Sequence, residues 1–102
     1  MRQCNIMMHG QIAGILLETE KGFSLHYKEG YTGQAISLTL PVRTEAYTFT
    51  FFPPFFDGLL PEGVQLEALL RLRKLDRYDF FGQLIAVGSD LVGAVTVEAL
   101  SV

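Results

Sequence analysis

A stretch of ten residues in the middle of the chain, PFFDGLLPEG at residues 54–63, separates two differently patterned halves of the sequence. Its two prolines and two glycines prevent a regular helix or strand from running across it, because both residue types disturb regular backbone structure. Its two phenylalanines and two leucines are nevertheless too apolar for an ordinary mobile loop. We therefore expect an irregular segment that packing holds in a fixed conformation.

The residues before this segment show the alternation that is typical of half-buried β-strands. Apolar and polar side chains alternate from Phe23 to Tyr27, and aromatic residues alternate with threonine over residues 47–51. In a further segment, Ile36, Leu38 and Leu40 would share one face of a strand. The predicted strands cover residues 3–9, 11–18, 23–27, 35–40 and 47–51.

The residues after the segment have a helical pattern. Pro61 suits the first position of a helix, and the leucines that follow it at a spacing close to 3.6 predict a helix over residues 62–74. Asp79 is a suitable N-cap for a second helix, which Gly88 ends, and a last strand follows at about residues 94–97. The expected fold class is α+β: a small, mainly antiparallel sheet or open barrel with two helices in the second half.

The composition predicts an exposed apolar surface. The chain has 102 residues, of which 49% are hydrophobic, and a chain of this length has room for one modest core. Apolar surface that remains outside a core usually marks an interface, although an unusually dense core is the alternative. We expect residues 1–102 to form a single domain, too small for a catalytic domain of the usual kinase or dehydrogenase size.

The charged residues are unevenly distributed. A net charge of −3 gives no global attraction to nucleic acid. Half of the eight basic residues nevertheless form one cluster, which consists of Arg71, Arg73, Lys74 and Arg77. Asp76 is the only acidic residue among them. This basic cluster either contacts phosphate or an acidic partner, or is a solvated helix end that complements its own dipole.

The N-terminus and the cysteine content point to the cytoplasm. Cys4 is the only cysteine, so no intramolecular disulfide can form. The first residues lack the apolar stretch and cleavage site of a signal peptide, and no apolar run approaches the roughly 18 residues of a membrane helix. We expect a cytoplasmic protein.

Catalytic and metal-binding patterns are weak. His9 and His26 lie in predicted strands without a second ligand type at metal spacing, and Gly30–Gly33 is a lone GxxG that is typical of a turn. Ser24, His26 and Asp57 would make a nucleophile triad only if the fold brought them together. We expect neither a metal nor a cofactor.

Asp57 and Glu62 lie on either side of Pro61 and form one acidic pair that could do acid–base work. A plainer role is structural: Asp57 would accept backbone N–H groups of a turn, and Glu62 suits a first helical turn. The aromatic strand at residues 47–52 contains no lysine or arginine, so it lacks the pattern of a single-stranded nucleic-acid site. We therefore expect no enzymatic activity.

Several segments resemble, in order, the N-terminal subdomain of HipA-type toxin kinases. PFFDGLLPEG is close to that family's FF-[DE]-[NG]-LLPEG motif. ISLTLP at residues 36–41 is similar to its SLSLPL, and LDRYDFFGQLIAVG at residues 75–88 is similar to its D-D-F-x-L-L-x-x-[LV]-G helix. Gly10 with the strand after it, the F-x-Y strand at Phe23–Tyr27 and the G-A-V strand at residues 93–95 also match.

The resemblance implies a binding protein. In HipA-type kinases the ATP-binding loop, the catalytic-base aspartate and the metal-binding aspartate all lie in later parts of the chain. A separate subdomain of this kind is similar to HipS, the small antitoxin of three-component HipBST toxin–antitoxin systems. In those systems HipT is the kinase, HipB is the helix-turn-helix DNA-binding member, and the kinase's substrates are aminoacyl-tRNA synthetases.

The implied function is that of an antitoxin that binds and inhibits a HipT- or HipA-like serine/threonine kinase. The alternative is a non-inhibitory structural subunit that completes the kinase fold and bridges it to a HipB-like protein. A third possibility is an autonomous nucleic-acid-binding module that uses the basic cluster. Under the first two, nucleic acid is reached only indirectly, through the complex.

We place the expected partner-binding surface in the PFFDGLLPEG segment and the helix start that follows it. A rigid loop presents apolar groups at low ordering cost. Alternatively, its phenylalanines and leucines plug the open end of the sheet and have a structural role. On either interpretation, the four residues from Glu62 to Gln65 are the better contact candidates, and one of them would be the wedge if the protein enters the kinase cleft. The candidate residues are Phe55, Phe56, Asp57, Leu59, Leu60, Pro61, Glu62, Gly63, Val64 and Gln65.

Overall fold

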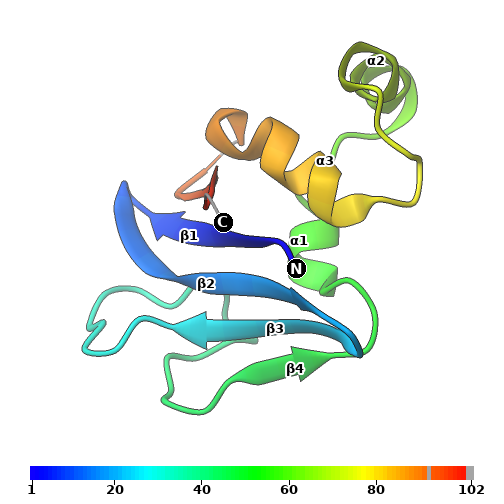
Figure 1. Ribbon diagram of the computed structural model, residues 1–102. Coiled ribbons are helices and arrows are strands. Elements are labelled where there is room, and N and C mark those ends of the chain that lie inside the picture. Colours follow the sequence, from blue (N-terminus) through cyan, green and yellow to red (C-terminus); the bar gives the residue numbers. More distant parts are fainter. Residues whose placement is uncertain (92, 101–102) are drawn as a thin grey trace.

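The structure, a computed structural model, describes residues 1–91 and 93–100. Within these residues, five strands form one open sheet in the order β4-β3-β2-β1-β5, and every neighbouring pair is antiparallel (Figure 1). This confirms the predicted α+β class. The strands are β1 Gln3–Met8, β2 Gln11–Thr19, β3 Gly22–Tyr27, β4 Tyr47–Phe49 and β5 Val95–Ala99.

Tight turns connect the first three strands. His9 and Gly10 both have positive φ, +51° and +81°, as a two-residue hairpin turn that follows the twist of the strands requires. Glu20 and Lys21 make the second turn, between β2 and β3. β4 is shorter than the strand predicted at residues 47–51.

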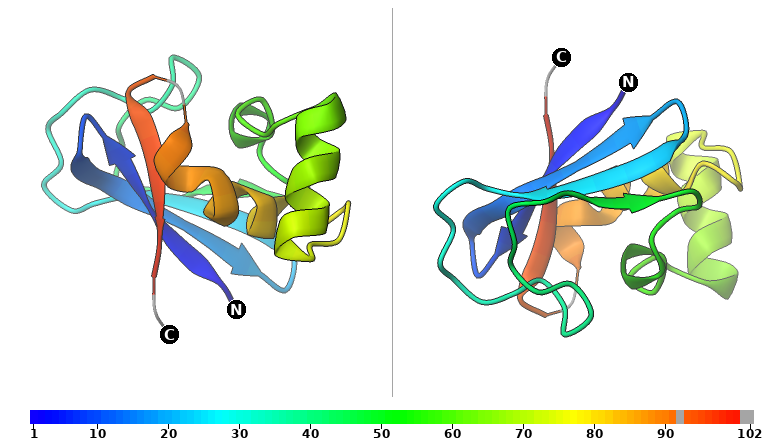
Figure 2. Two further views of the ribbon diagram at one scale, coloured as in Figure 1. Left: turned by 90° about the horizontal axis from the view of Figure 1, so that it is seen from above. Right: turned by 90° about the horizontal axis from the view of Figure 1, so that it is seen from below.

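The helices lie on one side of the sheet, and α2 lies outermost, away from the strands (Figures 1 and 2). The two predicted helices are confirmed as α2 and α3, and a one-turn helix, α1, precedes them. The described helices are α1 Pro54–Asp57, α2 Gly63–Arg73, α3 Phe80–Val87 and the short 3-10 helix η1 Gly88–Asp90.

The core lies between the sheet and α3. Cys4 of β1 lies opposite Leu16 of β2, which lies opposite Leu25 of β3, and all three are buried. On the same face Phe23 stacks on Phe81 of α3, with ring centroids 6.2 Å apart. Burial raises the pKa of Cys4 to about 12, so its thiol stays protonated and unreactive at neutral pH.

The strand predicted at residues 35–40 is wrong. The backbone N–H of Leu40 donates to the carbonyl three residues earlier, at 3.0 Å, so the chain turns back on itself. The hydroxyl of Tyr27 accepts from the N–H of Ile36 at 2.9 Å and donates to the Leu40 carbonyl. Ile36 and Leu40 are buried, but Leu38 at the turn is 99% exposed, because a turn breaks the alternation that a strand would continue.

The expectation of a wholly irregular PFFDGLLPEG segment is also wrong in part. Pro54 occupies the first position of α1, where a helix needs no N–H donor, so one helical turn forms before Gly58 ends it. Pro61 lies before α2 rather than in its first position, because Glu62, in an extended conformation, takes the N-cap.

Arg2 ties α3 to the sheet. The Asp79 carboxylate caps α3 as predicted, accepting the N–H of Gly82 at 3.0 Å. The guanidinium of Arg2 donates to Asp79 at 2.7 Å and to Glu18 of β2 at 2.8 Å, and it lies 5.2 Å from the ring centroid of Phe81. The hydrogen bonds from Arg2 lower the pKa of both carboxyl groups.

This cluster predicts an acid-dependent contribution to stability. Because the folded-state pKa values of Glu18 and Asp79 are lowered, their contribution is present above the ordinary carboxyl range near pH 4 and is lost below it. Arg2→Gln should cost about 1 kcal/mol at pH 7, a modest value because the ion pairs are partly exposed. Thermal unfolding of both proteins between about pH 7 and pH 3 should show the difference shrinking with acidification; parallel curves would contradict this.

Candidate partner-binding surface

The first half of the PFFDGLLPEG segment packs into the protein. Phe56 is 0% exposed and belongs to the hydrophobic core. Phe55 is half-buried and meets the Phe56 ring edge-on, with centroids 5.2 Å apart. Leu59 and Leu60 are also half-buried against the core. These side chains fix the position of the backbone that follows them.

The end of the segment and the first two residues after it face solvent. Glu62, Gly63, Val64 and Gln65 are all exposed, and Val64 is 86% exposed. Gly63 has a left-handed φ of +59°, where a side chain would be strained, and this conformation turns the chain into α2. Pro61, directly before Glu62, is partly buried. The segment therefore consists of an anchored part followed by a projecting turn.

Helix α2 is only partly buried. None of its eleven residues is fully buried, and its main neighbour is α3. Leu72, near its end, is 80% exposed. An amphipathic helix normally covers its apolar stripe against another element. Six of its residues are apolar: Val64, Leu66, Ala68, Leu69, Leu70 and Leu72.

The predicted partner-binding surface ends at the first turn of α2, and of the later residues only the basic cluster was considered for contact, so the exposed Leu72 was missed. The leucine spacing predicted the helix but was not used to ask which of its leucines would be exposed. The available signal was their number, since six apolar positions among eleven are more than one contact face needs.

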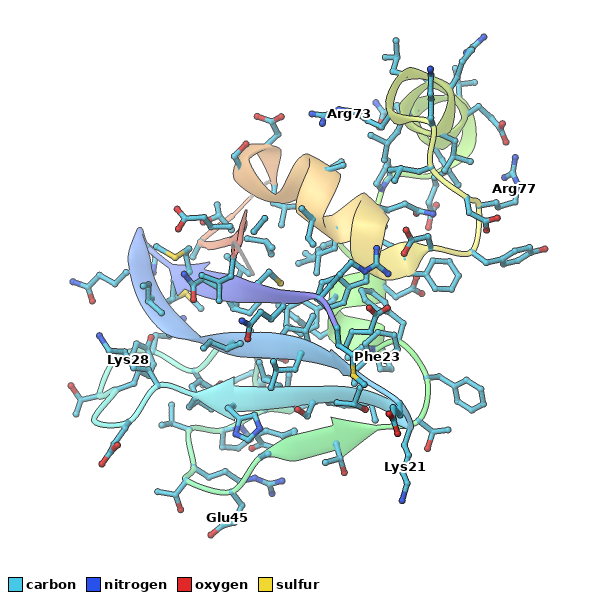
Figure 3. All side chains as sticks on the ribbon, in the orientation of Figure 1. Lys21, Phe23, Lys28, Glu45, Arg73 and Arg77 are labelled. Carbon is cyan, nitrogen blue, oxygen red and sulfur yellow. The ribbon has the colours of Figure 1, made fainter. Side chains whose placement is uncertain are left out.

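The basic cluster lies at the C-terminal end of α2 and in the loop after it. Arg71, Arg73 and Lys74 are exposed and make no ion pair within the described residues. Arg77 pairs with Glu67 of α2. Figure 3 shows Arg73 and Arg77 on the α2 side of the molecule, away from the sheet. The position is favourable for the helix dipole, and it leaves three cations available to a partner.

The residues considered for catalysis are not brought together. Ser24 and His26 lie on the face of β3 opposite Leu25, whereas Asp57 ends α1 on the helix side of the sheet. The predicted turn role of Asp57 is wrong, because the N–H groups of the turn donate to backbone carbonyls instead, as Leu59 does at 3.0 Å.

The remaining polar candidates have local structural contacts. The His9 ring lies 3.2 Å from the side-chain oxygen of Gln34, and Gly30–Gly33 belongs to a loop, as predicted. Across residues 1–91 and 93–100, no three histidine, cysteine or acidic side chains gather as metal ligands would. No helix in this part of the chain has both the length and the apolarity to cross a membrane.

Comparison with known families identifies the fold. The sequence profile of the HipA N-terminal domain matches residues 4–98. The chain belongs to the HipA N-terminal domain family. An uncharacterised protein of Haemophilus influenzae is 28% identical over 97 residues, which span 95% of this chain and 92% of that relative. A solved structure of the N-terminal domain of HipA toxin shares the fold, with a TM-score of 0.81, 24% identity, and coverage of 99% of this chain and 94% of that one.

The family resemblance suggested by the sequence motifs is thus confirmed. In this HipA N-terminal domain, PFFDGLLPEG forms α1, the connection to α2 and the first residue of α2. Within the motif at residues 75–88, the helix begins at Phe80, directly after its predicted N-cap Asp79. The PFFDGLLPEG motif therefore sets the direction in which the partly buried helix α2 leaves the core.

Proposed function

We propose that this protein is an antitoxin subunit that binds a HipT- or HipA-like serine/threonine kinase and inhibits it. Family membership connects the chain to HipA-type toxin–antitoxin systems. The observation that carries the proposal is the partly buried helix α2 with the projecting turn before it. Exposed apolar surface of this kind is typical of a binding site for another protein.

The relative from Haemophilus influenzae supports a separate subunit. The 97 matched residues span 92% of that protein, so it is about as long as this chain. A relative of this length supports a subunit that is separate from the kinase. We propose the same arrangement here, with the kinase as a second chain and a HipB-like DNA-binding protein in the same complex.

The anchored part of the PFFDGLLPEG segment and the projecting turn suggest how inhibition works. The anchored part, around Phe56, holds the projecting turn from Glu62 to Gln65 in one conformation, so little ordering entropy is lost on binding. We propose that this turn contacts the kinase and wedges against its cleft. The buried members of the candidate set then support the surface, and the exposed members make the contact.

The test is a titration of kinase activity. The purified HipT- or HipA-like kinase, ATP and its protein substrate are mixed with increasing amounts of this protein, and complex formation is followed by size-exclusion chromatography. We expect a stable complex and loss of substrate phosphorylation as the protein approaches one equivalent. Failure to bind would contradict the proposal.

A structural subunit is the second candidate function. Ile15 and Leu17 of β2 are half-exposed on the sheet face that points away from α3, so the molecule presents apolar side chains on two separate sides. Two such sides suit a subunit that bridges a kinase and a HipB-like protein. Binding with phosphorylation intact in the titration would favour this function over inhibition.

A further inference from the structure

We propose that the outer side of α2, beyond the PFFDGLLPEG segment, docks into an apolar groove of the partner kinase that is rimmed by carboxylates. Leu72 and Val64 would enter the groove, and Arg71, Arg73 and Lys74 would pair with the carboxylates. The identity of the partner rests on the proposed function. The surface and the chemistry of its complement rest on the structure.

The apolar part of this surface is continuous along the helix. In an α-helix, residues four apart lie on one side, so Val64, Ala68 and Leu72 follow each other over about 12 Å. Val64 and Leu72 are 86% and 80% exposed, and they mark the two ends of this line. Two large side chains exposed at this spacing fit a groove about two helical turns long.

The basic residues near Leu72 indicate the charge that the rim of the kinase groove would carry. Arg71, Arg73 and Lys74 flank Leu72, and within the described residues they make no ion pair. The chain outside residues 71–77 carries ten acidic and only four basic residues, so the end of α2 is a basic region on an acidic protein. A complementary surface is therefore acidic where it meets this end, and opposite charges also speed the encounter.

A protein groove fits these observations better than nucleic acid or lipid. Phosphate contacts would use the cations but would leave Val64 and Leu72 in water, and the acidic remainder would repel a polyanion. Membrane-surface helices combine a broad apolar face with basic residues, whereas the eleven residues of α2 carry apolar side chains around the helix. Only a groove with both apolar walls and carboxylates accounts for both features.

The test compares variants of exposed residues that do not affect packing. Leu72→Ser removes the apolar anchor, and the double variant Arg71→Glu, Arg73→Glu reverses the charge. Leu38→Ser and Lys28→Glu are the matched controls, because Leu38 is 99% exposed and Lys28 lies far from α2 (Figure 3). Binding of each protein to the immobilised kinase is measured at low and high salt, and unchanged thermal unfolding verifies the fold.

We expect Leu72→Ser to weaken binding about tenfold or more, mainly through faster dissociation. The double variant should slow association and flatten its dependence on salt, and both controls should stay within about twofold of the wild type. If both α2 variants bound the kinase as tightly as the wild type, this inference would be overturned and the proposed function would stay intact. Absence of wild-type binding would overturn both. The inference would also be overturned if the wild type bound duplex DNA or anionic phosphatidylserine vesicles and the α2 variants lost this binding while they still bound the kinase.

Discussion

Phe56→Ala is expected to destabilise the protein by about 3–5 kcal/mol, because it removes a fully buried aromatic ring and leaves a cavity. Domains of this size are stable by only about 5–15 kcal/mol, so the variant should be close to unfolding at 37 °C. Equilibrium unfolding in urea, followed by circular dichroism, measures the loss directly. The Phe56 ring anchors the segment from which α2 projects.

Phe51→Ala is the matched control. Phe51 lies five residues earlier and is 82% exposed, so its loss should change the free energy of unfolding by no more than about 0.5 kcal/mol. If Phe56→Ala had the stability of the Phe51 variant, the buried half of the segment would not be a structural anchor. Its phenylalanines would then have to be assigned to partner contact.

Gly22→Ala is expected to cost about 3 kcal/mol at the edge of the sheet. Gly22 has φ of +144°, and a Cβ there would overlap the carbonyl oxygen of Phe49 and lie 2.9 Å from that of Thr50. These are backbone atoms of β4 and of the residue after it, so the edge strand itself must move. The value combines about 1–3 kcal/mol for overpacking with roughly 1 kcal/mol for backbone strain.

Gly10→Ala separates the two contributions. Gly10 also has a positive φ, +81°, but no atom lies within 4 Å of a Cβ at that position. This variant should lose only about 1 kcal/mol, through backbone strain. Thermal unfolding gives both values, and hydrogen exchange at the Phe49 amide reports whether β4 is displaced. Equal losses for the two variants would mean that β3 and β4 are not packed as closely as the structure shows.

Local patterns predicted those parts of the fold in which a residue's role depends on its neighbours in sequence. The alternation of apolar and polar residues predicted β3 correctly. The prediction that Asp79 caps α3 was also correct, because an N-cap side chain bonds only to the backbone of the next three residues. The prediction of a strand at residues 35–40 failed because the Ile36 N–H donates to the hydroxyl of Tyr27 rather than to a neighbouring strand. Helix α1 was missed because proline was treated as a breaker at a position where it starts a helix.

The candidate surface was predicted in outline only. The hydrophobic content predicted exposed apolar residues, and Val64 and Leu72 confirm this. The residues from Glu62 to Gln65 were already the preferred contact candidates, and Val64 is indeed exposed whereas Phe56 is buried. The sequence leaves the role of the phenylalanines open, because burial depends on residues that are distant in sequence. The partial burial of α2 is likewise a property of the tertiary arrangement.

The measurement that tests the central claim most directly is inhibition of the partner kinase by the wild type, Val64→Asp and Phe51→Asp. Both substituted side chains are more than four-fifths exposed, at 86% and 82%, so neither change should unfold the protein. We predict that Val64→Asp raises the concentration needed for half-inhibition about tenfold or more, while Phe51→Asp stays within about twofold of the wild type. Equal inhibition by all three proteins would contradict contact through the projecting turn, and no inhibition by the wild type would contradict the antitoxin function itself.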